Sequence, residues 1–159
     1  MKLKNVLIVV DDIEVSKRFY KELFGLEIIA DFGGNVILTE GLVLQEKQSW
    51  ETYIGKEITN GHHSSELYFE ENQMDLFLEK LERTDFKIQY VVPPFEHGWG
   101  QRIVRIYDPD FHMIEVGESM EYVARRFLAE GMSPKEVANK TMMPQSVIEM
   151  IAAEDAWPE

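Results

Sequence analysis

The segment FEHGWG at residues 95–100 brings His97 and Trp99 close together in the sequence. Two prolines precede this segment and two glycines lie within it, which favours a loop. One interpretation is a loop that closes over a cleft, in which the indole of Trp99 stacks on a planar ligand. Ordinary packing at the rim of a cleft explains the same residues equally well.

The other histidines do not form a ligand set by their spacing. His62 and His63 are adjacent, so they cannot share one face of a strand, and we expect both to be exposed to solvent. His112 is opposite in phase to Glu115 along one predicted strand, so we do not expect it to be a ligand.

The chain has no cysteine, which excludes disulfides and thiolate metal sites.

The spacing of apolar residues predicts the elements that must position these side chains. The first half reads as one βαβββ unit, with a strand at 2–10, a helix at 13–24 that Gly25 stops, and strands at 26–31, 36–38 and 41–45. A polar stretch at 47–63 reads as an irregular connector. The second half repeats the order, with a strand at 66–70, a helix at 74–82 and strands at 87–92, 101–107 and 112–116. Pro93-Pro94 is expected to open a loop.

Residues 119–159 differ in kind and predict a helical tail of three short segments. Ser133, Pro134 and Glu136 have the spacing of a helix start. The order of predicted helices in the tail is similar to that of a helix-turn-helix motif. The segment from Glu118 to Glu159 holds eight acidic and four basic residues, which argues against DNA binding. Its apolar residues exceed what three short helices are expected to bury among themselves, which indicates packing on the rest of the chain or on a second subunit.

Two motifs resemble a known family. They are VLIVVDDIEVSKRFYKELFGLEI, with Asp12 and Gly25, and WGQRIVRIYDPDFHMIEVGE, with Asp108-Pro109-Asp110 and Glu115. Together they are similar to the vicinal-oxygen-chelate superfamily, the glyoxalase/bleomycin resistance protein/dioxygenase family, over residues 2–118. The resemblance implies an α+β fold of two βαβββ modules, at about 2–48 and 63–118, that form a half-barrel cup. Residues 119–159 would then be a C-terminal α-helical extension.

The resemblance also implies where metal ligands would lie, on the first and fourth strands of each module. Those positions are Asn5, Leu44, Glu66 and Glu115. Leu44 removes one ligand, and Asn5, Glu66 and Glu115 would suit Mg²⁺ or Mn²⁺ better than Zn²⁺. The alternative is a cup without metal, in which Glu66 and Glu115 are recognition or acid–base groups.

Strand alternation extends the predicted ligand-binding face. Counting back from Asp108 puts Gln101, Ile103 and Arg105 on the cup face, and Arg105 is expected to neutralise Glu115, to anchor an anionic ligand group, or to form a plain structural ion pair. The predicted ligand-binding residues are Asn5, Leu44, Tyr68, Trp99, Gln101, Ile103, Arg105 and Met113. We expect Asn5, Glu66, Arg105 and Glu115 to converge in one cleft. At Phe111 many family members have glycine, so a positive φ is not expected there.

The function implied is that of a glyoxalase-related enzyme, a lyase or isomerase acting next to a carbonyl group with Glu66 and Glu115 as catalytic residues. The alternative is a binder that sequesters a small, perhaps cationic, ligand, as bleomycin-resistance proteins do. The net charge of −13 argues against nucleic-acid partners. No apolar run approaches the roughly 18–20 residues of a membrane span. We therefore expect a cytoplasmic protein. Because members of the family that the motifs resemble commonly complete their clefts by pairing modules within or between chains, the resemblance implies a homodimer.

Overall fold

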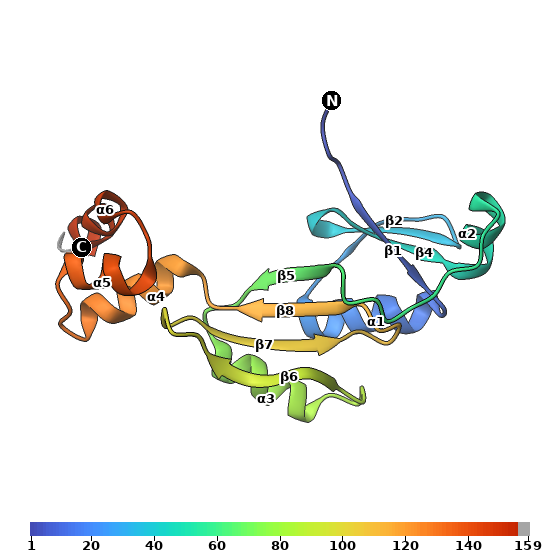
Figure 1. The fold of residues 1–159 in the computed structure, drawn as a ribbon. Coiled ribbons are helices and arrows are strands. Elements are labelled where there is room, and N and C mark those ends of the chain that lie inside the picture. Colours follow the sequence, from blue (N-terminus) through green and yellow to red (C-terminus); the bar gives the residue numbers. More distant parts are fainter. Residues whose placement is uncertain (156–159) are drawn as a thin grey trace. The chain divides into compact units, whose positions relative to one another are not determined.

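The computed structural model describes residues 1–155 and has the predicted order of elements, β-α-β-β-β twice and then three helices, with one further helix between the two repeats (Figure 1). The strands are β1 (Val6–Val10), β2 (Ile28–Asp31), β3 (Asn35–Leu38), β4 (Leu42–Glu46), β5 (Glu66–Glu70), β6 (Gln89–Glu96), β7 (Arg102–Tyr107) and β8 (Met113–Gly117). The helices are α1 (Ile13–Phe24), α2 (Lys47–Ile54), α3 (Met74–Arg83), α4 (Met120–Ala129), α5 (Pro134–Thr141) and α6 (Gln145–Asp155), with a 3₁₀ turn at Thr39–Gly41. The predicted α+β fold is confirmed.

The described chain forms two compact units. The first comprises Met1–Leu67, Lys80–Val91 and Ile106–Ile114, and the second comprises Tyr68–Glu79, Val92–Arg105 and the chain from Glu115 onward. No helix among the described residues is both long and apolar enough to cross a membrane.

The first sheet has the order β1-β4-β3-β2, with β1 parallel to β4. One of its faces is buried with α1, and the buried residues are Ile8, Val10, Phe19, Tyr20, Leu23, Val36, Leu38 and Leu44. Helix α1 begins and ends where predicted, because the Asp12 carboxylate accepts hydrogen bonds from the first turn and Gly25 adopts the left-handed conformation at φ 68°.

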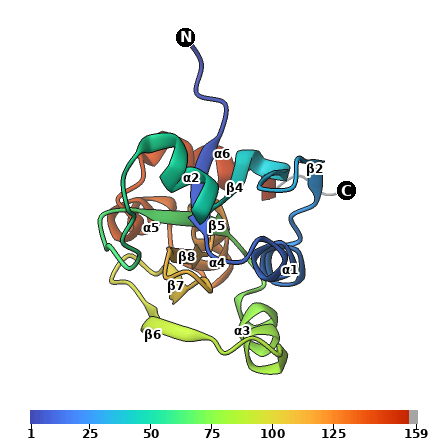
Figure 2. The ribbon, with the colours of Figure 1, turned by 90° about the vertical axis from the view of Figure 1, so that its right-hand side faces the viewer.

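The polar connector is partly helical, which corrects the prediction of an irregular segment. Helix α2 follows β4 directly and ends at Gly55, whose φ of 66° allows a left-handed cap. It lies beside β1 and β4 in both views (Figures 1 and 2).

The second sheet has the order β5-β8-β7-β6 (Figure 1). Strand β6 extends through Pro93-Pro94 to Glu96, so the predicted loop after Val92 is wrong. Proline is tolerated here because β6 is the edge strand, where a missing backbone N–H breaks no ladder between two neighbours.

The turn between β7 and β8 contains Phe111 at φ 66°, which contradicts the expectation from its side chain. The Asp108 carboxylate accepts hydrogen bonds from the backbone N–H groups of Asp110 (2.9 Å) and His112 (2.8 Å). The Phe111 N–H donates to the Asp108 carbonyl at 3.1 Å. These bonds fix the turn and offset the cost of a left-handed non-glycine residue.

The tail forms its own small core. Helices α4, α5 and α6 bury Val123, Ala124, Phe127, Val137, Ala138, Ile148 and Ile151 together. The Ser133 capping box predicted for α5 is present. The expectation that three short helices cannot bury all their apolar residues among themselves holds in part, because the helices form this core while Met142 and Met150 remain 73% and 61% exposed.

Candidate functional site

Gln101 connects several predicted ligand-binding residues of the second unit. Its Nε2 donates to the hydroxyl of Tyr68 at 3.2 Å and to the carbonyl of Glu118 at 2.8 Å. Its Oε1 accepts from the indole Nε1 of Trp99 at 3.1 Å. Because its amide is engaged in these three bonds, Gln101 fixes the orientations of Tyr68 and Trp99 rather than presenting its own polar atoms.

Gly117 provides space on this face. A Cβ at Gly117 would lie 3.1 Å from the Nε2 of Gln101 and 3.3 Å from side-chain atoms of both Ile103 and Tyr68. Tyr68, Gln101 and Ile103 therefore share the face of the sheet on which alternation placed them. Ile103 is buried, whereas Tyr68 remains 46% exposed.

Arg105 and Glu115 form the ion pair considered from the sequence, from β7 to the neighbouring β8. The Glu115 side chain is only 10% exposed and that of Arg105 is 25% exposed. A carboxylate this deep needs a compensating partner, and the guanidinium supplies it. Because a guanidinium carries five N–H donors, Arg105 has the chemistry to hold a ligand oxygen as well.

In the FEHGWG segment, beside this pair, three rings contact one another in order along the sequence. The rings of His97 and Trp99 are stacked, with centroids 3.9 Å apart and an interplanar angle of 12°, and Phe95 contacts His97 edge-on at 4.6 Å. Partial burial, followed by the positive charge of Arg105, lowers the pKa of His97 below its ordinary value. The imidazole of His97 is therefore uncharged at neutral pH, and its flat ring can contact a ligand.

A cleft of about 300 Å³ in the first unit contains two further predicted residues. The lining residues are Val6, Leu7, Ile8, Val9, Ile58, Thr59, Asn60, Ser65, Glu66, Leu67, His112 and Met113. Two of them, Glu66 and Met113, were predicted from the sequence. Asn5 and Leu44 do not line this cleft.

The strand phase predicted that His112 is not a ligand, yet His112 lines this cleft and is oriented by a buried carboxylate. Its Nδ1 lies 2.8 Å from the Oδ2 of Asp108, which also accepts from the Tyr20 hydroxyl at 2.8 Å. Burial alone would lower the pKa of His112, but the hydrogen bond and charge of Asp108 outweigh burial and raise it above the ordinary value. A histidine with one nitrogen fixed in this way is suited to proton transfer or anion binding.

We expect the two histidines to titrate on opposite sides of the ordinary value of 6.5, His112 above and His97 below. A raised pKa in the folded state means that His112 contributes stability that is present below the unfolded pKa. That contribution is lost as the pH rises through the folded pKa. Titration of the imidazole proton resonances by NMR checks this, and a lower pKa for His112 than for His97 would contradict it.

Leu44 lies on the opposite face of the first sheet from the one expected. It pairs with Ile8 and with Val36, and all three are buried against the core. By alternation, Leu7 and Val9 of β1 share their face with Val43 and Gln45 instead. Gln45 in turn bonds within its own unit, donating to Gly34 at 2.9 Å and Ser49 at 2.8 Å.

The predicted metal ligands do not fit a metal centre. Glu115 is paired with the guanidinium of Arg105, and Asn5 is exposed ahead of β1. Within residues 1–155, no three or more His, Cys, Asp or Glu side chains are grouped so that they could hold a metal ion. Asn5 and Glu66 belong to the first unit and Arg105 and Glu115 to the second, so the convergence of all four stays a prediction.

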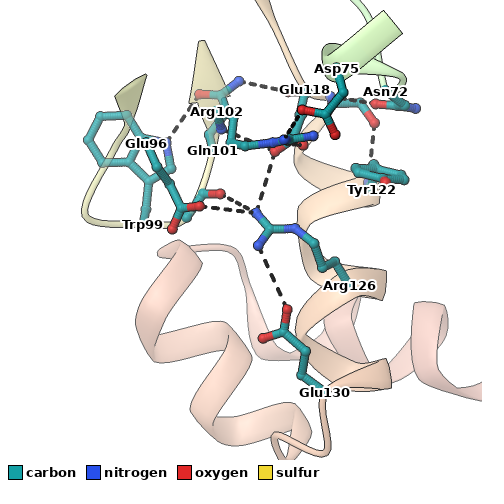
Figure 3. Close-up of polar contacts among 12 residues, drawn as sticks. Asn72, Asp75, Glu96, Trp99, Gln101, Arg102, Glu118, Tyr122, Arg126 and Glu130 are labelled. Atoms are coloured by element: carbon teal, nitrogen blue, oxygen red, sulfur yellow. Dashed lines mark hydrogen bonds and ion pairs between the residues drawn. The ribbon is translucent and has the colours of Figure 1, made fainter. Parts of the chain in front are cut away.

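Two residues of the second unit escaped the sequence reasoning, Glu118 and Arg126. Glu118 is fully buried and bonded to Arg102 (Figure 3). Arg126 donates to the carbonyl of Gly100. The signal in the sequence was the position of Glu118, a charged residue directly after the apolar strand β8. A carboxylate buried at such a position requires charged or polar partners.

Comparison with known proteins agrees with this fold. The family model for the glyoxalase-like domain matches residues 3–121. The chain therefore belongs to the glyoxalase-like domain family, part of the superfamily that the motifs resemble. No curated protein sequence matches the chain significantly.

Solved structures are similar over about three quarters of the chain. A protein of unknown function from Agrobacterium tumefaciens is 35% identical, with a TM-score of 0.65, over 75% of this chain and 94% of that one. A glyoxalase-related enzyme from Fulvimarina pelagi is 21% identical, with a TM-score of 0.63, over 74% and 88%. A lactoylglutathione lyase from Agrobacterium tumefaciens is 22% identical, with a TM-score of 0.57, over 74% and 93%. The last two likenesses concern the fold alone.

Proposed function

We propose that the protein is a glyoxalase-related enzyme that moves a proton at the carbon next to a carbonyl group of a small planar substrate, using side chains alone. The observation that supports this most is the Arg105–Glu115 pair, a mostly buried carboxylate with a guanidinium against it. The stacked rings of His97 and Trp99 offer a planar substrate a surface. The names of two structural neighbours, a glyoxalase-related enzyme and a lactoylglutathione lyase, are consistent with this class of chemistry.

The proposed step balances without an external reagent. The Glu115 carboxylate takes a proton from the carbon, the C–H electron pair forms a C=C bond to the carbonyl carbon, and the C=O π pair moves to oxygen. Arg105 donates N–H bonds to the enolate oxygen, where the charge develops. Return of the proton to carbon gives exchange with solvent, and protonation of the oxygen gives the enol.

Phenylpyruvate in D₂O is a suitable probe, because it combines a ring, a carbonyl group and an acidic methylene. The protein should accelerate loss of the methylene proton signal, measured by NMR, and should act less on pyruvate, which lacks the ring. Equal rates with and without protein, over a panel of arylalkyl α-keto acids and arylacetaldehydes that all carry a hydrogen on the carbon next to the carbonyl group, would reject the proposal.

A non-catalytic binder is the second candidate, and the stacked His97–Trp99 pair favours it. Such a site would sequester a planar compound, and the net charge of −13 would favour a cationic one. Quenching of protein fluorescence by an aromatic ligand without any proton exchange would distinguish this candidate from the enzyme.

The predicted roles of Glu66 and Met113 belong to the first unit's cleft. There, Glu66 shares the cleft lining with His112, whose imidazole Asp108 holds in place. We propose that Glu66 and His112 contact ligand in that cleft, where Met113 supplies apolar contact.

We also propose a homodimer. Met142 and Met150 remain largely exposed on the tail, and exposed apolar side chains of this size are suited to burial against a second copy. Light scattering across a range of protein concentrations should give twice the mass of one chain. A monomer at the highest concentration would reject the dimer.

A further inference from the structure

A buried carboxylate lies where β8 leads into α4. Glu118 is fully buried, and its Oε1 accepts from the Nε of Arg102 at 2.7 Å. Its Oε2 accepts from the Arg102 backbone N–H at 3.1 Å and lies 3.4 Å from the Nη2 of Arg126 (Figure 3). Because a buried carboxylate is costly without partners, Glu118 fixes both arginines in place.

Arg126 extends from α4 to the segment that holds the stacked rings. Its Nη2 donates to the carbonyl of Gly100 at 2.5 Å. The same nitrogen lies 3.8 Å from the carboxylate of Glu96 (Figure 3). Glu96 and Gly100 lie on either side of His97 and Trp99 in the sequence. The guanidinium therefore holds both ends of the ring-bearing segment.

An apolar contact adds to this polar one. Gly100 is buried at φ 92°, and a Cβ there would lie 2.2 Å from the Cζ of Phe127, the residue after Arg126. Phe127 is itself in the core of the tail. The segment thus packs directly against α4 at Gly100, where only glycine leaves enough space.

A second set of hydrogen bonds connects Glu118 to the stacked rings. Its backbone carbonyl accepts from the Nε2 of Gln101, and the Oε1 of Gln101 accepts from the Trp99 indole. Both routes end at the same pair of rings, one through the backbone of Gly100 and the other through the side chain of Trp99.

We propose that Arg126, held by the buried Glu118, is a positioning residue for the stacked pair of His97 and Trp99. Most of α4 follows residues 3–121, which the family model matches, so a helix beyond that match supports the binding segment. The inference rests on the proposed function only in taking Trp99 as a ligand contact. Arg126 itself touches no ligand.

The test uses the full chain with Trp50 and Trp157 replaced by Phe, so that Trp99 alone fluoresces. In this background we compare Arg126→Met with Arg125→Met, a change on the same helix whose arginine bonds to Glu121 and Glu154 instead. R126M should raise the acrylamide quenching of Trp99 toward that of a free indole. It should also weaken phenylpyruvate binding about tenfold, the usual effect of one hydrogen bond to a charged group.

The controls separate positioning from folding. R125M should match the parent in both measurements, and R126K, which keeps the charge but loses the planar fork, should fall between. The proposal is overturned if R126M quenches and binds as R125M does, or if Trp99 becomes exposed while affinity is unchanged. If Trp99 responds to R126M but the parent protein binds neither phenylpyruvate nor the other aryl probes, the positioning role is supported and the proposed function fails.

Discussion

Replacing Gly100 with alanine should destabilise the protein by about 2–4 kcal/mol, the combined cost of overpacking and of a strained left-handed residue. The added methyl would lie 2.2 Å and 2.4 Å from two ring atoms of Phe127, and φ is 92° at this position. The ring cannot move aside freely, because Phe127 is only 3% exposed within the tail core. Urea denaturation of the wild type and G100A measures the difference in the free energy of unfolding.

Gly98 provides the matched control, two residues away in the same segment. A Cβ there meets nothing within 4 Å, so G98A should change stability by less than about 0.5 kcal/mol. A double-mutant cycle with Phe127→Leu isolates the contact, because the cost of G100A should shrink once the ring is gone. Equal costs for G100A and G98A would show that Gly100 does not pack against Phe127 in solution.

The elements were predictable wherever a local signal fixed them. Asp12 and Gly25 mark both ends of α1, and Ser133 with Glu136 marks the start of α5. These signals act within a few residues, so they do not depend on the rest of the fold. The repeated order of elements then indicated the fold class.

The phase of β4 was not predictable in the same way. Leu42, Val43 and Leu44 are consecutive apolar residues, and all three are buried. A continuous apolar run does not show which of its side chains face which side of the sheet, and a shift of one residue reverses every side chain. Along β7 and the residue before it, by contrast, Gln101, Ile103 and Arg105 were placed on one face by counting back from Asp108. The structure puts Ile103 beside Gly117 and pairs Arg105 with Glu115.

Hydrogen bonds within the turn overrode the side-chain preference at Phe111, whereas the partners of Glu118 lie far from it in the sequence. The Asp108 carboxylate stabilises a left-handed Phe111 that its side chain alone argues against. Glu118 meets Arg102 and Arg126, which lie 16 and 8 residues away in the sequence. No short motif encodes such pairs, because they form only when separate strands and helices pack together.

Replacing Glu115 with glutamine should reduce the enzyme-dependent proton exchange of phenylpyruvate by about 10²–10⁴-fold, the usual contribution of a general base. The amide is nearly isosteric with the carboxylate but accepts no proton at neutral pH. Binding should change far less, because the rings of His97 and Trp99 and the donors of Arg105 remain. NMR exchange rates measure the first quantity, and the quenching of Trp99 fluorescence, in the background with Trp50 and Trp157 replaced by Phe, measures the second.

Three further variants distinguish a general base from a structural ion pair. Glu115→Asp keeps a carboxylate and should restore part of the exchange rate, whereas Arg105→Met should weaken both binding and exchange, since it removes the donor to the enolate oxygen. Glu121→Gln removes an exposed carboxylate that pairs with Arg125 on α4, and it should leave both unchanged. If E115Q is destabilised in urea yet exchanges protons at the wild-type rate per folded molecule, Glu115 serves only to balance Arg105. A third outcome is that the wild type binds the aryl ligands while neither the wild type nor E115Q accelerates proton exchange. The face formed by Tyr68, Trp99 and Arg105 is then a binding site without catalysis, and the sequestering function replaces the enzymatic one.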